Sequence, residues 1–408
     1  MSAIAPSRRT FVRSAVSAAL ALSCVRTRPS PHVIVVGAGA FGGWTALHLL
    51  RRGARVTLLE AWGPGNGLAS SGGETRVIRA TYGPDRIYVE LVARAFELWK
   101  EHERRTGRRL LYPVGVLWLV SPDDAYERAA LPIVRAAGLA IDEWTVAGAA
   151  ERYPQINFQD VSWVIHEPDS GYLTARLACE TVLDAFVAEG GEYRQSAARV
   201  DESGGEVRGV TLDDGRNLTA DRYVFACGPW LATVLPNAIG ARIRPTRQEV
   251  FYFGTPAGDP RFEEDRLPVW IDNGSPLFYG IPGNGSRGFK LADDTRGPDF
   301  DPTTGDRTPS AEGVRAARAY LARRFPALAN APLLTGHVCQ YENSPDGHYI
   351  VDRLPSAPNA WVVGGGSGHG FKVGPALGEM VSGLVLDDRD PPAFFSLTRL
   401  SRIARRRG

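Results

Sequence analysis

Three glycines and one acidic residue near the start of the chain have the spacing needed to bind a dinucleotide. Gly37, Gly39 and Gly42 form a Gly-x-Gly-x-x-Gly pattern directly after an apolar run, and Glu60 ends the next apolar run. Gly37 permits a tight turn, Gly39 lets the backbone approach a pyrophosphate, and Gly42 lets helix and strand pack closely. The amides of the following helix would face the phosphates, and Glu60 would accept hydrogen bonds from a ribose diol.

The surrounding residues predict a strand–turn–helix–strand unit, the context in which such a glycine pattern indicates dinucleotide binding. A strand over 33–36 is followed by an Ala- and Leu-rich helix, which Gly53 ends, and a second strand covers 56–59. Alone, three glycines at this spacing are also typical of an ordinary surface turn. The complete unit predicts a dinucleotide-binding domain and leaves the dinucleotide open.

A second glycine-rich turn lies near the C-terminus. A strand over 360–363 leads into Gly364–Gly370, and a helix over 376–386 follows. Nicotinamide enzymes rarely need such a turn late in the chain, whereas FAD holds its flavin far from its adenine and needs a second backbone cradle. A third turn of this kind, with Gly228, ends the apolar strand that begins at residue 223; it could equally be an ordinary turn after a core strand.

The stretch between these turns divides into helical and strand-rich parts. Helices are predicted over 87–106, over 126–137 with a break at Pro132, and over 174–189 with Thr174 as its cap. Residues 110–120 alternate like a strand, and Asp213-Asp214-Gly215 predicts a hairpin. From 242 to 334 short runs alternate with Gly, Pro, Asp and Asn turns, which favours an antiparallel sheet.

These patterns predict an α/β dinucleotide-binding domain with an inserted α+β substrate domain built on an antiparallel sheet. The predicted division gives 31–110, 160–238 and 336–395 to the first domain, and 111–159 and 239–335 to the second. Residues 396–408 form a basic tail, for which a solvated, frayed end is favoured over a nucleic-acid site.

Composition sets limits on partners. The 408 residues carry a net charge of +2 and are 44% hydrophobic, which is ordinary for a globular protein and argues against nucleic acid as a partner. The four cysteines are far apart and form no Cys-x-x-Cys pair, so no metal site is expected. No segment is long and apolar enough to predict stable membrane insertion.

Residues 1–30 are predicted to be a leader. Arg8 and Arg9 precede a weakly apolar run that is too short to span a bilayer, with a small-residue site at Ala19-Leu20-Ala21. This resembles a twin-arginine signal, which implies export of a folded, cofactor-loaded protein to the periplasm or another extracytoplasmic space. The alternative is a disordered basic leader with a chance arginine pair on a cytoplasmic protein.

Five local motifs in order resemble the D-amino-acid-oxidase-like flavoenzymes, and most closely the group of monomeric sarcosine oxidase and N-methyl-L-tryptophan oxidase. Beyond the first glycine pattern, the matches are the loop from Gly73 to Gly83, Tyr279-Gly280-x-Pro282 followed by Lys290, the segment from Gly336 to Asp352, and Gly368-His369-Gly370-Phe371-Lys372. The resemblance implies a Rossmann-like FAD domain of the glutathione-reductase type and a monomeric protein.

The resemblance also assigns roles to single residues. Cys339 matches a cysteine joined covalently to the flavin; without its flanking motif, a lone cysteine is usually a core residue. Arg79 and Lys372 match the cations that clamp a substrate carboxylate. Lys290 matches a lysine that promotes the reaction of the flavin with oxygen, although a single lysine in a strand is most often exposed. The remaining implied contacts are with the cofactor or substrate: Thr75, Arg76, Val200, Gly228, Gly368 and Gly370 with FAD, and Tyr279 and Tyr341 over the substrate.

The implied activity is oxidation of a small secondary amino acid, N-methylated or cyclic, with molecular oxygen as acceptor and release of an imine or aldehyde and hydrogen peroxide. Two alternatives stay open: a dehydrogenase that passes electrons to a carrier, and an exported flavin-binding protein without catalysis. One position departs from the sarcosine oxidases, which carry a histidine where this chain has Asp294. An anion there would favour a further amine or hydroxyl on the substrate, unless Asp294 turns away and pairs with Arg296.

Overall fold

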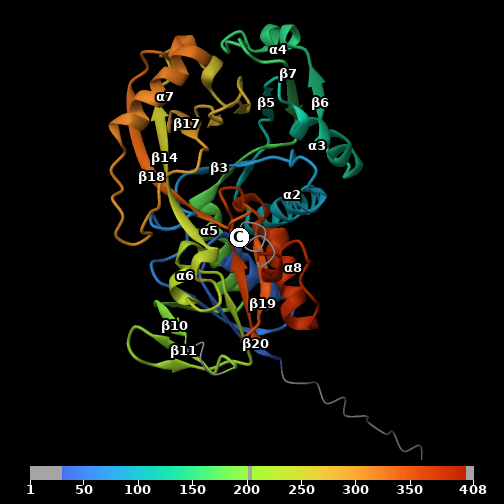
Figure 1. The fold of residues 1–408 in the computed structure, drawn as a ribbon, viewed down its shortest axis with the longest axis vertical. Coiled ribbons are helices and arrows are strands. Elements are labelled where there is room, and N and C mark those ends of the chain that lie inside the picture. The colour runs from blue at the N-terminus through green and yellow to red at the C-terminus, as the bar shows by residue number, and fades with distance from the viewer. Residues whose placement is uncertain (1–29, 201–204, 401–408) are drawn as a thin grey trace, which may run out of the picture. The chain divides into compact units, whose positions relative to one another are not determined.

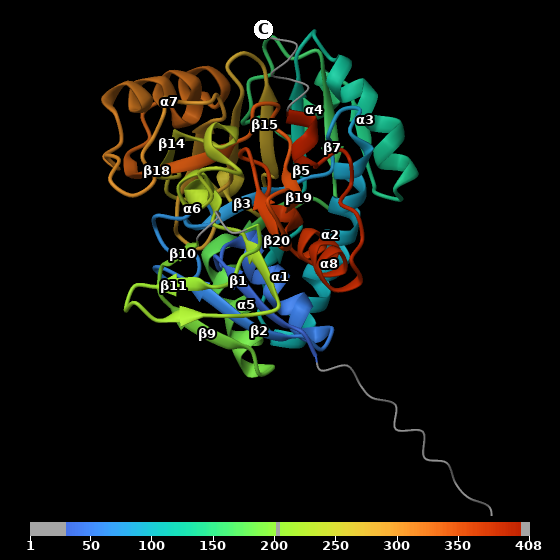
Figure 2. The same ribbon diagram turned by 60° about the horizontal axis from the view of Figure 1, so that its bottom comes forward.

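The structure, a computed structural model, describes residues 30–200 and 205–400. The leader up to residue 29, with Cys24, and the tail from 401 lie outside the described residues. Eight α-helices are found in the described part (Figures 1 and 2). They are α1 (Ala40–Arg51), α2 (Arg86–Thr106), α3 (Ala125–Ala136), α4 (Val146–Arg152), α5 (Ala175–Ala188), α6 (Leu231–Val234), α7 (Ala311–Arg324) and α8 (Gly374–Asp387).

A six-stranded sheet contains the predicted dinucleotide unit. Its strands, in spatial order, are β19 (Ile350–Leu354), β20 (Ala357–Gly364), β13 (Arg222–Phe225), β1 (His32–Val36), β2 (Arg55–Glu60) and β9 (Glu192–Gln195). All pair in parallel except β19, which runs antiparallel to β20. The carboxyl ends of β1, β13 and β20 therefore meet at one edge, where ligands bind in open α/β sheets.

Helices α1 and α8 pack tightly against each other because α8 presents glycines at the contact. A Cβ on Gly378 would lie 2.7 Å from the backbone carbon of Trp44, and one on Gly374 would lie 2.9 Å from the oxygen of Ala40. Helix α1 thereby links the strands near the N-terminus to the C-terminal turn. The strand–turn–helix prediction at both ends of the chain is confirmed.

A second, eight-stranded sheet lies at the top of Figure 1. Its order is β18 (Leu333–Asn343), β14 (Arg244–Phe253), β17 (Phe289–Asp293), β16 (Phe278–Ile281), β15 (Val269–Asn273), β5 (Val116–Val120), β7 (Trp163–Glu167) and β6 (Asp142–Trp144). Only the β5–β15 pair is parallel, so the predicted antiparallel sheet is confirmed with one exception. Helix α7 covers it through Tyr320 and Leu321, which join a buried cluster with Trp270 and Phe289.

Two small sheets complete the described strands. One joins β3 (Thr75–Ile78), β8 (Gly171–Thr174) and β4 (Leu111–Tyr112); the other joins β10 (Ala198–Val200), β11 (Val210–Leu212) and β12 (Asn217–Leu218). The predicted hairpin at residues 213–215 connects β11 and β12. Strand β3 carries Thr75 and Arg76 and is bonded on one side by β8.

Several predicted boundaries differ from the structure. Strands β7 and β18 belong to the eight-stranded sheet, although the boundaries at 160 and 336 give most of their residues to the dinucleotide domain. The predicted break at Pro132 is wrong: α3 continues through it, because Leu131 and Val134 on either side are buried in the core. Thr174 precedes α5, but its hydroxyl bonds the carbonyl of Leu110 and does not cap the helix. The predicted strand over 110–120 is divided into β4 and β5.

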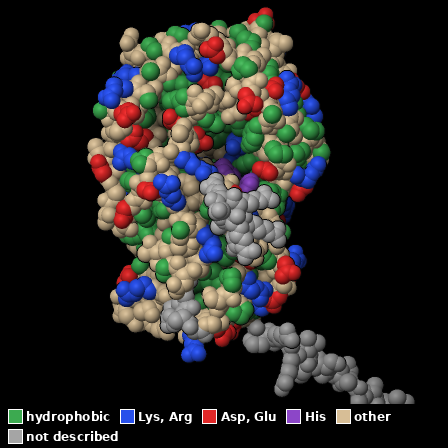
Figure 3. Space-filling model, in the orientation of Figure 1, with side chains coloured by type: hydrophobic (Ala, Val, Ile, Leu, Met, Phe, Trp, Pro, Cys, Tyr) green, Lys and Arg blue, Asp and Glu red, His purple; other side chains and the backbone are tan. Residues whose placement is uncertain are grey.

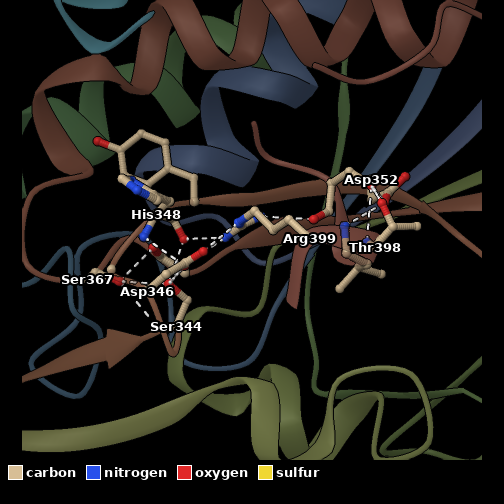
Figure 4. Close-up of polar contacts among 12 residues, drawn as sticks. Ser344, Asp346, His348, Asp352, Ser367, Thr398 and Arg399 are labelled. Atoms are coloured by element: carbon tan, nitrogen blue, oxygen red, sulfur yellow. Dashed lines mark hydrogen bonds and ion pairs between the residues drawn. The ribbon is translucent and has the colours of Figure 1, made fainter. Parts of the chain in front are cut away.

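The first residues of the basic tail are held in place, contrary to the prediction of a frayed end. Arg399 donates from Nε to Asp346 at 2.8 Å and from Nη2 to the His348 carbonyl at 2.9 Å (Figure 4). Asp352 accepts from the amide of Leu397 at 2.7 Å. Leu397 and Leu400 are buried at the same time. The acidic residues of the motif after Cys339 thus fasten the end of the described chain.

Lys and Arg side chains are interspersed with Asp and Glu on the face shown in Figure 3. Among the helices of residues 30–200 and 205–400, none has the length and apolar character that crossing a bilayer requires. The same residues contain no group of three or more His, Cys, Asp or Glu side chains placed to hold a metal ion.

Candidate functional site

A large pocket opens where the carboxyl ends of the six-stranded sheet face the eight-stranded sheet. The empty space within its lining, including space open to solvent, is about 1480 Å³. The predicted site residues that line it are Gly37, Gly39, Glu60, Arg76, Gly228, Tyr279, Cys339, Tyr341, Gly368 and Gly370. The folding of the chain therefore brings both ends of the sequence and its middle to one cavity.

The first glycine pattern forms a turn that no larger residue could adopt. Gly37 has a φ of +103°, and a Cβ on it would lie 2.3 Å from the Ala226 carbonyl oxygen. A Cβ on Gly42 would lie 1.8 Å from the oxygen of Gly37, so Gly42 acts through packing and does not line the pocket. Gly39 is the N-cap of α1 and has no capping side chain, which leaves the start of this helix turned to the pocket.

Glu60 lies at the pocket wall directly after the buried part of β2. Its carboxylate accepts hydrogen bonds from the amides of Ala38 at 2.8 Å and Trp62 at 3.2 Å. Burial raises the pKa of Glu60, while these amides oppose the shift. The carboxylate is thus held at the predicted ribose position by the glycine turn itself.

The C-terminal turn is equally intolerant of side chains. Gly368 has a φ of +86°, and a Cβ on it would lie 2.6 Å from the ring of Tyr341. A Cβ on Gly370 would lie 2.5 Å from the ring of Phe41, which belongs to α1. Glycines thus form both turns where the chain needs positive φ or close contact, and the two turns face the same space.

Gly228 lines the pocket, whereas Val200 is not part of the pocket lining. Val200 ends β10 and packs against a core cluster, whereas Ser196, Ala197 and Ala198 line this edge. Backbone just before Val200 therefore forms this wall, and the predicted contact of Val200 with the adenosine half stays a prediction.

Arg76 holds the loop that precedes β3 and points toward Cys339. Its guanidinium donates to the carbonyls of Ser70 at 2.9 Å, Thr75 at 2.8 Å and Gly72, and Nη2 lies 3.7 Å from the Cys339 sulfur. Cys339 is half-buried in β18 and lines the pocket. The Cys339 thiol therefore lines the pocket beside a fixed cation. It is not the buried core cysteine that was the alternative from the sequence alone.

A buried lysine and a half-buried arginine from distant parts of the chain meet at one tyrosine. The Lys372 ammonium donates to the Tyr82 hydroxyl at 2.7 Å and to the His369 carbonyl at 2.8 Å. The Arg79 guanidinium carbon lies 4.3 Å from the centre of the Tyr82 ring. Burial, and after it the charge of Arg79, lowers the pKa of Lys372 well below its usual value. Two cations forced together in this way favour an anionic ligand between them.

Glu167 organises the loop after Arg79, and nothing in the sequence pointed to it. Its carboxylate is buried and accepts from the amides of Ala80 at 2.6 Å and Thr81 at 3.0 Å. It also accepts from the Trp118 indole at 2.9 Å and the Ser170 hydroxyl at 2.6 Å. Because Arg79 donates to the carbonyl of Thr81, Glu167 fixes the backbone that orients Arg79. No local sequence pattern relates Glu167 to this loop, because Glu167 ends β7 and reaches the loop only in the folded chain.

Asp294 is half-buried beside Tyr341, a residue of the pocket lining, and does not pair with Arg296 as the second alternative required. It accepts a hydrogen bond from the Tyr341 hydroxyl at 2.6 Å. Burial raises its pKa, opposed by Tyr341 and by the charges of Arg79 and Lys372. Asp294 is therefore an acid within electrostatic reach of both cations.

Lys290 is buried in β17, so the common alternative of an exposed lysine is excluded. Its ammonium donates to the carbonyl of Thr75 at 2.8 Å and lies 5.9 Å from the centre of the Tyr279 ring. Burial, followed by the charge of Arg76, lowers the pKa of Lys290 to about 7. Lys290, Arg76 and Cys339 thus form one cluster, and Arg79, Lys372 and Asp294 form a neighbouring one.

The fold and this site define a dinucleotide-binding oxidoreductase whose backbone cradles fit FAD: two glycine-rich turns, an acid at the predicted ribose position and a cationic end. The sequence matches the family of FAD dependent oxidoreductases over residues 32–384, and the chain belongs to this family. Monomeric sarcosine oxidase from Bacillus sp. (strain B-0618) is 30% identical over 375 residues, which cover 90% of this chain and 95% of that protein.

Other similar proteins agree with this assignment. N-methyl-L-tryptophan oxidase from Salmonella arizonae is 29% identical over 382 residues, which cover 91% of this chain and 99% of that protein. Among solved structures, L-proline dehydrogenase from P. horikoshii superposes with a TM-score of 0.80 at 22% identity, covering 91% of this chain and 98% of that chain. The last similarity shows the fold alone. The predicted FAD-binding Rossmann-like fold with a substrate domain is confirmed.

Proposed function

We propose that this chain oxidises a small secondary amino acid, N-methylated or cyclic, with FAD as cofactor and oxygen as acceptor. The observation that carries the proposal is the convergence of Arg79 and Lys372 on Tyr82 next to the cofactor pocket. A guanidinium and an ammonium held together in a buried site bind a carboxylate well, because a carboxylate offers two oxygens and cancels their repulsion. The amine of the substrate would then lie over the flavin.

Bound FAD would supply the two-electron redox chemistry that couples oxidation of the neutral amine to reduction of oxygen; the products would be hydrogen peroxide and an imine, which water would hydrolyse to an aldehyde. The chain supplies orientation and charge. Arg79 and Lys372 would fix the substrate, and Tyr279 and Tyr341 would pack over it. Thr75 and Arg76 would contact the flavin end of the cofactor, and Gly368 and Gly370 would leave it room.

Lys290 supports an oxidase rather than a dehydrogenase. A buried ammonium that donates to the Thr75 carbonyl and lies 5.9 Å from the ring centre of Tyr279, which lines the pocket, would stabilise the negative charge that forms on oxygen. We also infer that Cys339 attaches to the flavin, since its sulfur is open to the pocket and fixed beside Arg76.

Asp294 is the residue that we expect to select among amino acids. A carboxylate hydrogen-bonded to Tyr341 would repel a second acid on the substrate and accept from an amine or hydroxyl. Sarcosine, which has no such group, is therefore not the expected best substrate. The names of the relatives support an N-methylated amino acid as the general class.

The test is the stoichiometry of turnover by the full chain. An oxidase consumes one oxygen and releases one hydrogen peroxide for each amine oxidised, measured with an oxygen electrode and a peroxidase-coupled dye. Turnover that needs an artificial carrier and gives no peroxide would establish the dehydrogenase. Absence of turnover with flavin bound, unchanged in Arg79 or Lys372 variants, would leave the non-catalytic binding protein.

We further propose export of the chain as a monomer by the twin-arginine route, guided by residues 1–30, and a division into an FAD domain and a substrate domain that follows the two large sheets. Export of the full chain that stops when Arg8 and Arg9 are both replaced by lysine supports this route. Unchanged localisation of that variant contradicts it. Light scattering of the purified chain gives the mass in solution that tests the monomer.

A further inference from the structure

The carboxylate of Glu342 has an unusual place in the cofactor pocket. Glu342 is 7% exposed, lines the pocket, and accepts a hydrogen bond at Oε1 from the amide of Gly366 at 3.1 Å. Its Oε2 is buried and has no hydrogen-bond partner among the described residues. A buried carboxylate oxygen without a donor is costly, so a donor from a ligand would stabilise it.

The surroundings of this oxygen are cleared by glycines of two turns. A Cβ on Gly228 would lie 3.6 Å from Oε2, and one on Gly364 would lie 3.5 Å from it. Burial raises the pKa of Glu342 to about 7, opposed by the amides of Gly365 and Gly366. The facing titratable group is the thiol of Cys227, whose own pKa is raised by burial, by Glu60 and by Glu342.

Only a few groups of FAD can donate a hydrogen bond to Oε2 of Glu342. The pyrophosphate only accepts hydrogen bonds and would repel a carboxylate; the donors are the adenine amine, the ribose hydroxyls, the ribityl hydroxyls and the flavin N3–H. Glu60 occupies the predicted ribose position. Cys339 and Tyr341 mark the flavin end, and Glu342 follows Tyr341 on β18 toward the turns after β13 and β20. Glu342 thus lies between the predicted flavin end and the predicted ribose end of the pocket, where the ribityl chain of FAD would lie.

We propose that Glu342 binds FAD as a carboxylate that accepts a hydrogen bond from a ribityl hydroxyl, and so positions the chain between flavin and pyrophosphate. The inference rests on FAD binding and not on amine oxidation. Its test measures binding, so its failure is distinct from failure of the proposed activity.

The experiment uses the full chain with Cys339→Ser, in which FAD binding is reversible, and titrates apoprotein by quenching of flavin fluorescence. Glu342→Gln is compared with Glu127→Gln. Glu127 is a matched control, because it is also buried, accepts from Asn273 at one oxygen, and has an unpartnered second oxygen among the described residues. It lies in α3 and does not line the pocket.

We expect Glu342→Gln to weaken FAD binding by about tenfold, because a charged hydrogen-bond acceptor is replaced by a neutral one, and Glu127→Gln to leave FAD binding unchanged. FAD analogues that lack the 2′-, 3′- or 4′-ribityl hydroxyl identify the partner. For one analogue, the loss of affinity relative to FAD should be larger with the Glu342 protein than with the Glu342→Gln protein. The proposal would be overturned if the Glu342, Glu342→Gln and Glu127→Gln proteins bound FAD equally well. It would also be overturned if every analogue lost the same affinity, relative to FAD, with the Glu342 protein and with the Glu342→Gln protein.

A second measurement needs no variant at Glu342. A hydroxyl donor stabilises the carboxylate, so FAD binding lowers the pKa of Glu342 and releases a proton. FAD affinity should therefore increase as the pH rises between about 6 and 8, and this increase should be smaller for the analogue lacking the contacted hydroxyl. Glu60 also titrates in the pocket, but its contribution is common to FAD and the analogue. The same pH profile for FAD and all three analogues would contradict the proposal.

Discussion

The two ends of the site differ in what forms them: one is formed mainly by backbone and the other by charged side chains. The cofactor end is shaped by backbone: Gly37, Gly42 and Gly368 make turns in which a Cβ would meet other atoms at under 3 Å. The proposed substrate end is shaped by charged side chains, with half-buried Arg79 and buried Lys372 meeting at Tyr82. We propose that the first end recognises the cofactor by shape and that the second recognises the substrate by charge. Changes at the first should therefore affect cofactor loading, and changes at the second should affect catalysis with the cofactor still bound.

The largest effect is expected at the cofactor end. Gly42→Ala places a Cβ 1.8 Å from the oxygen of Gly37, so the turn and α1 cannot keep their positions. We expect loss of nearly all bound flavin, measured as the ratio of absorbance of the flavin band to that of protein. Gly67→Ala is the control, because a Cβ there meets nothing within 4 Å. Full loading of Gly42→Ala would show that close packing at this turn is not required.

The next effect is expected at the substrate end. Arg79→Ala should lower kcat/KM for an amino acid by roughly 30- to 1000-fold, since removing one partner of a buried charge pair costs about 2–4 kcal/mol. The loss should be smaller for an amine without a carboxylate, and flavin loading should stay normal. Arg109→Ala is the control: Arg109 also lies 4.3 Å from a tyrosine ring, that of Tyr112, but is exposed. Equal losses for both substrates would contradict the carboxylate clamp.

The same difference explains what the sequence could and could not predict. The glycine turns were predictable because each depends on a short stretch in which strand, turn and helix follow one another. The charged end was predictable only through resemblance, because Arg79 and Lys372 come together through the fold. Glu167 and Glu342 escaped notice because a lone glutamate in a strand carries no pattern, and its partners lie on other elements. The helix through Pro132 and the ordered start of the tail were missed because buried contacts outweigh local preference there.

A third prediction separates the two half-reactions within the charged end. Lys290→Met should slow reoxidation of reduced flavin by oxygen by about 100-fold, as removal of a preorganised charge typically does, and leave anaerobic reduction by substrate nearly unchanged. Stopped-flow absorbance measures each step, with the exposed Lys100→Met as control. In the unsubstituted chain the oxygen reaction should slow as the pH rises through about 7, because the ammonium form of Lys290 is lost there. Reoxidation that is insensitive to Lys290→Met would favour the dehydrogenase.

The smallest effect is expected on specificity. Asp294→Asn removes the negative charge but can still accept a hydrogen bond from Tyr341. We expect kcat/KM for substrates with a second carboxylate to rise by about tenfold relative to those with a second amine, a difference of about 1.4 kcal/mol. Competition between paired substrates measures this ratio directly. An unchanged ratio would show that Asp294 does not face the substrate side chain.

The most direct test of the central claim is anaerobic bleaching of the flavin band of the full chain by a panel of amines. The panel holds sarcosine, N-methyl amino acids, proline, pipecolate and primary amino acids. The proposed function predicts rapid bleaching by a secondary amino acid, and loss of that bleaching in Arg79→Ala. With flavin bound, failure of every secondary amino acid to bleach the band would contradict the assignment of this site to secondary amino acid oxidation.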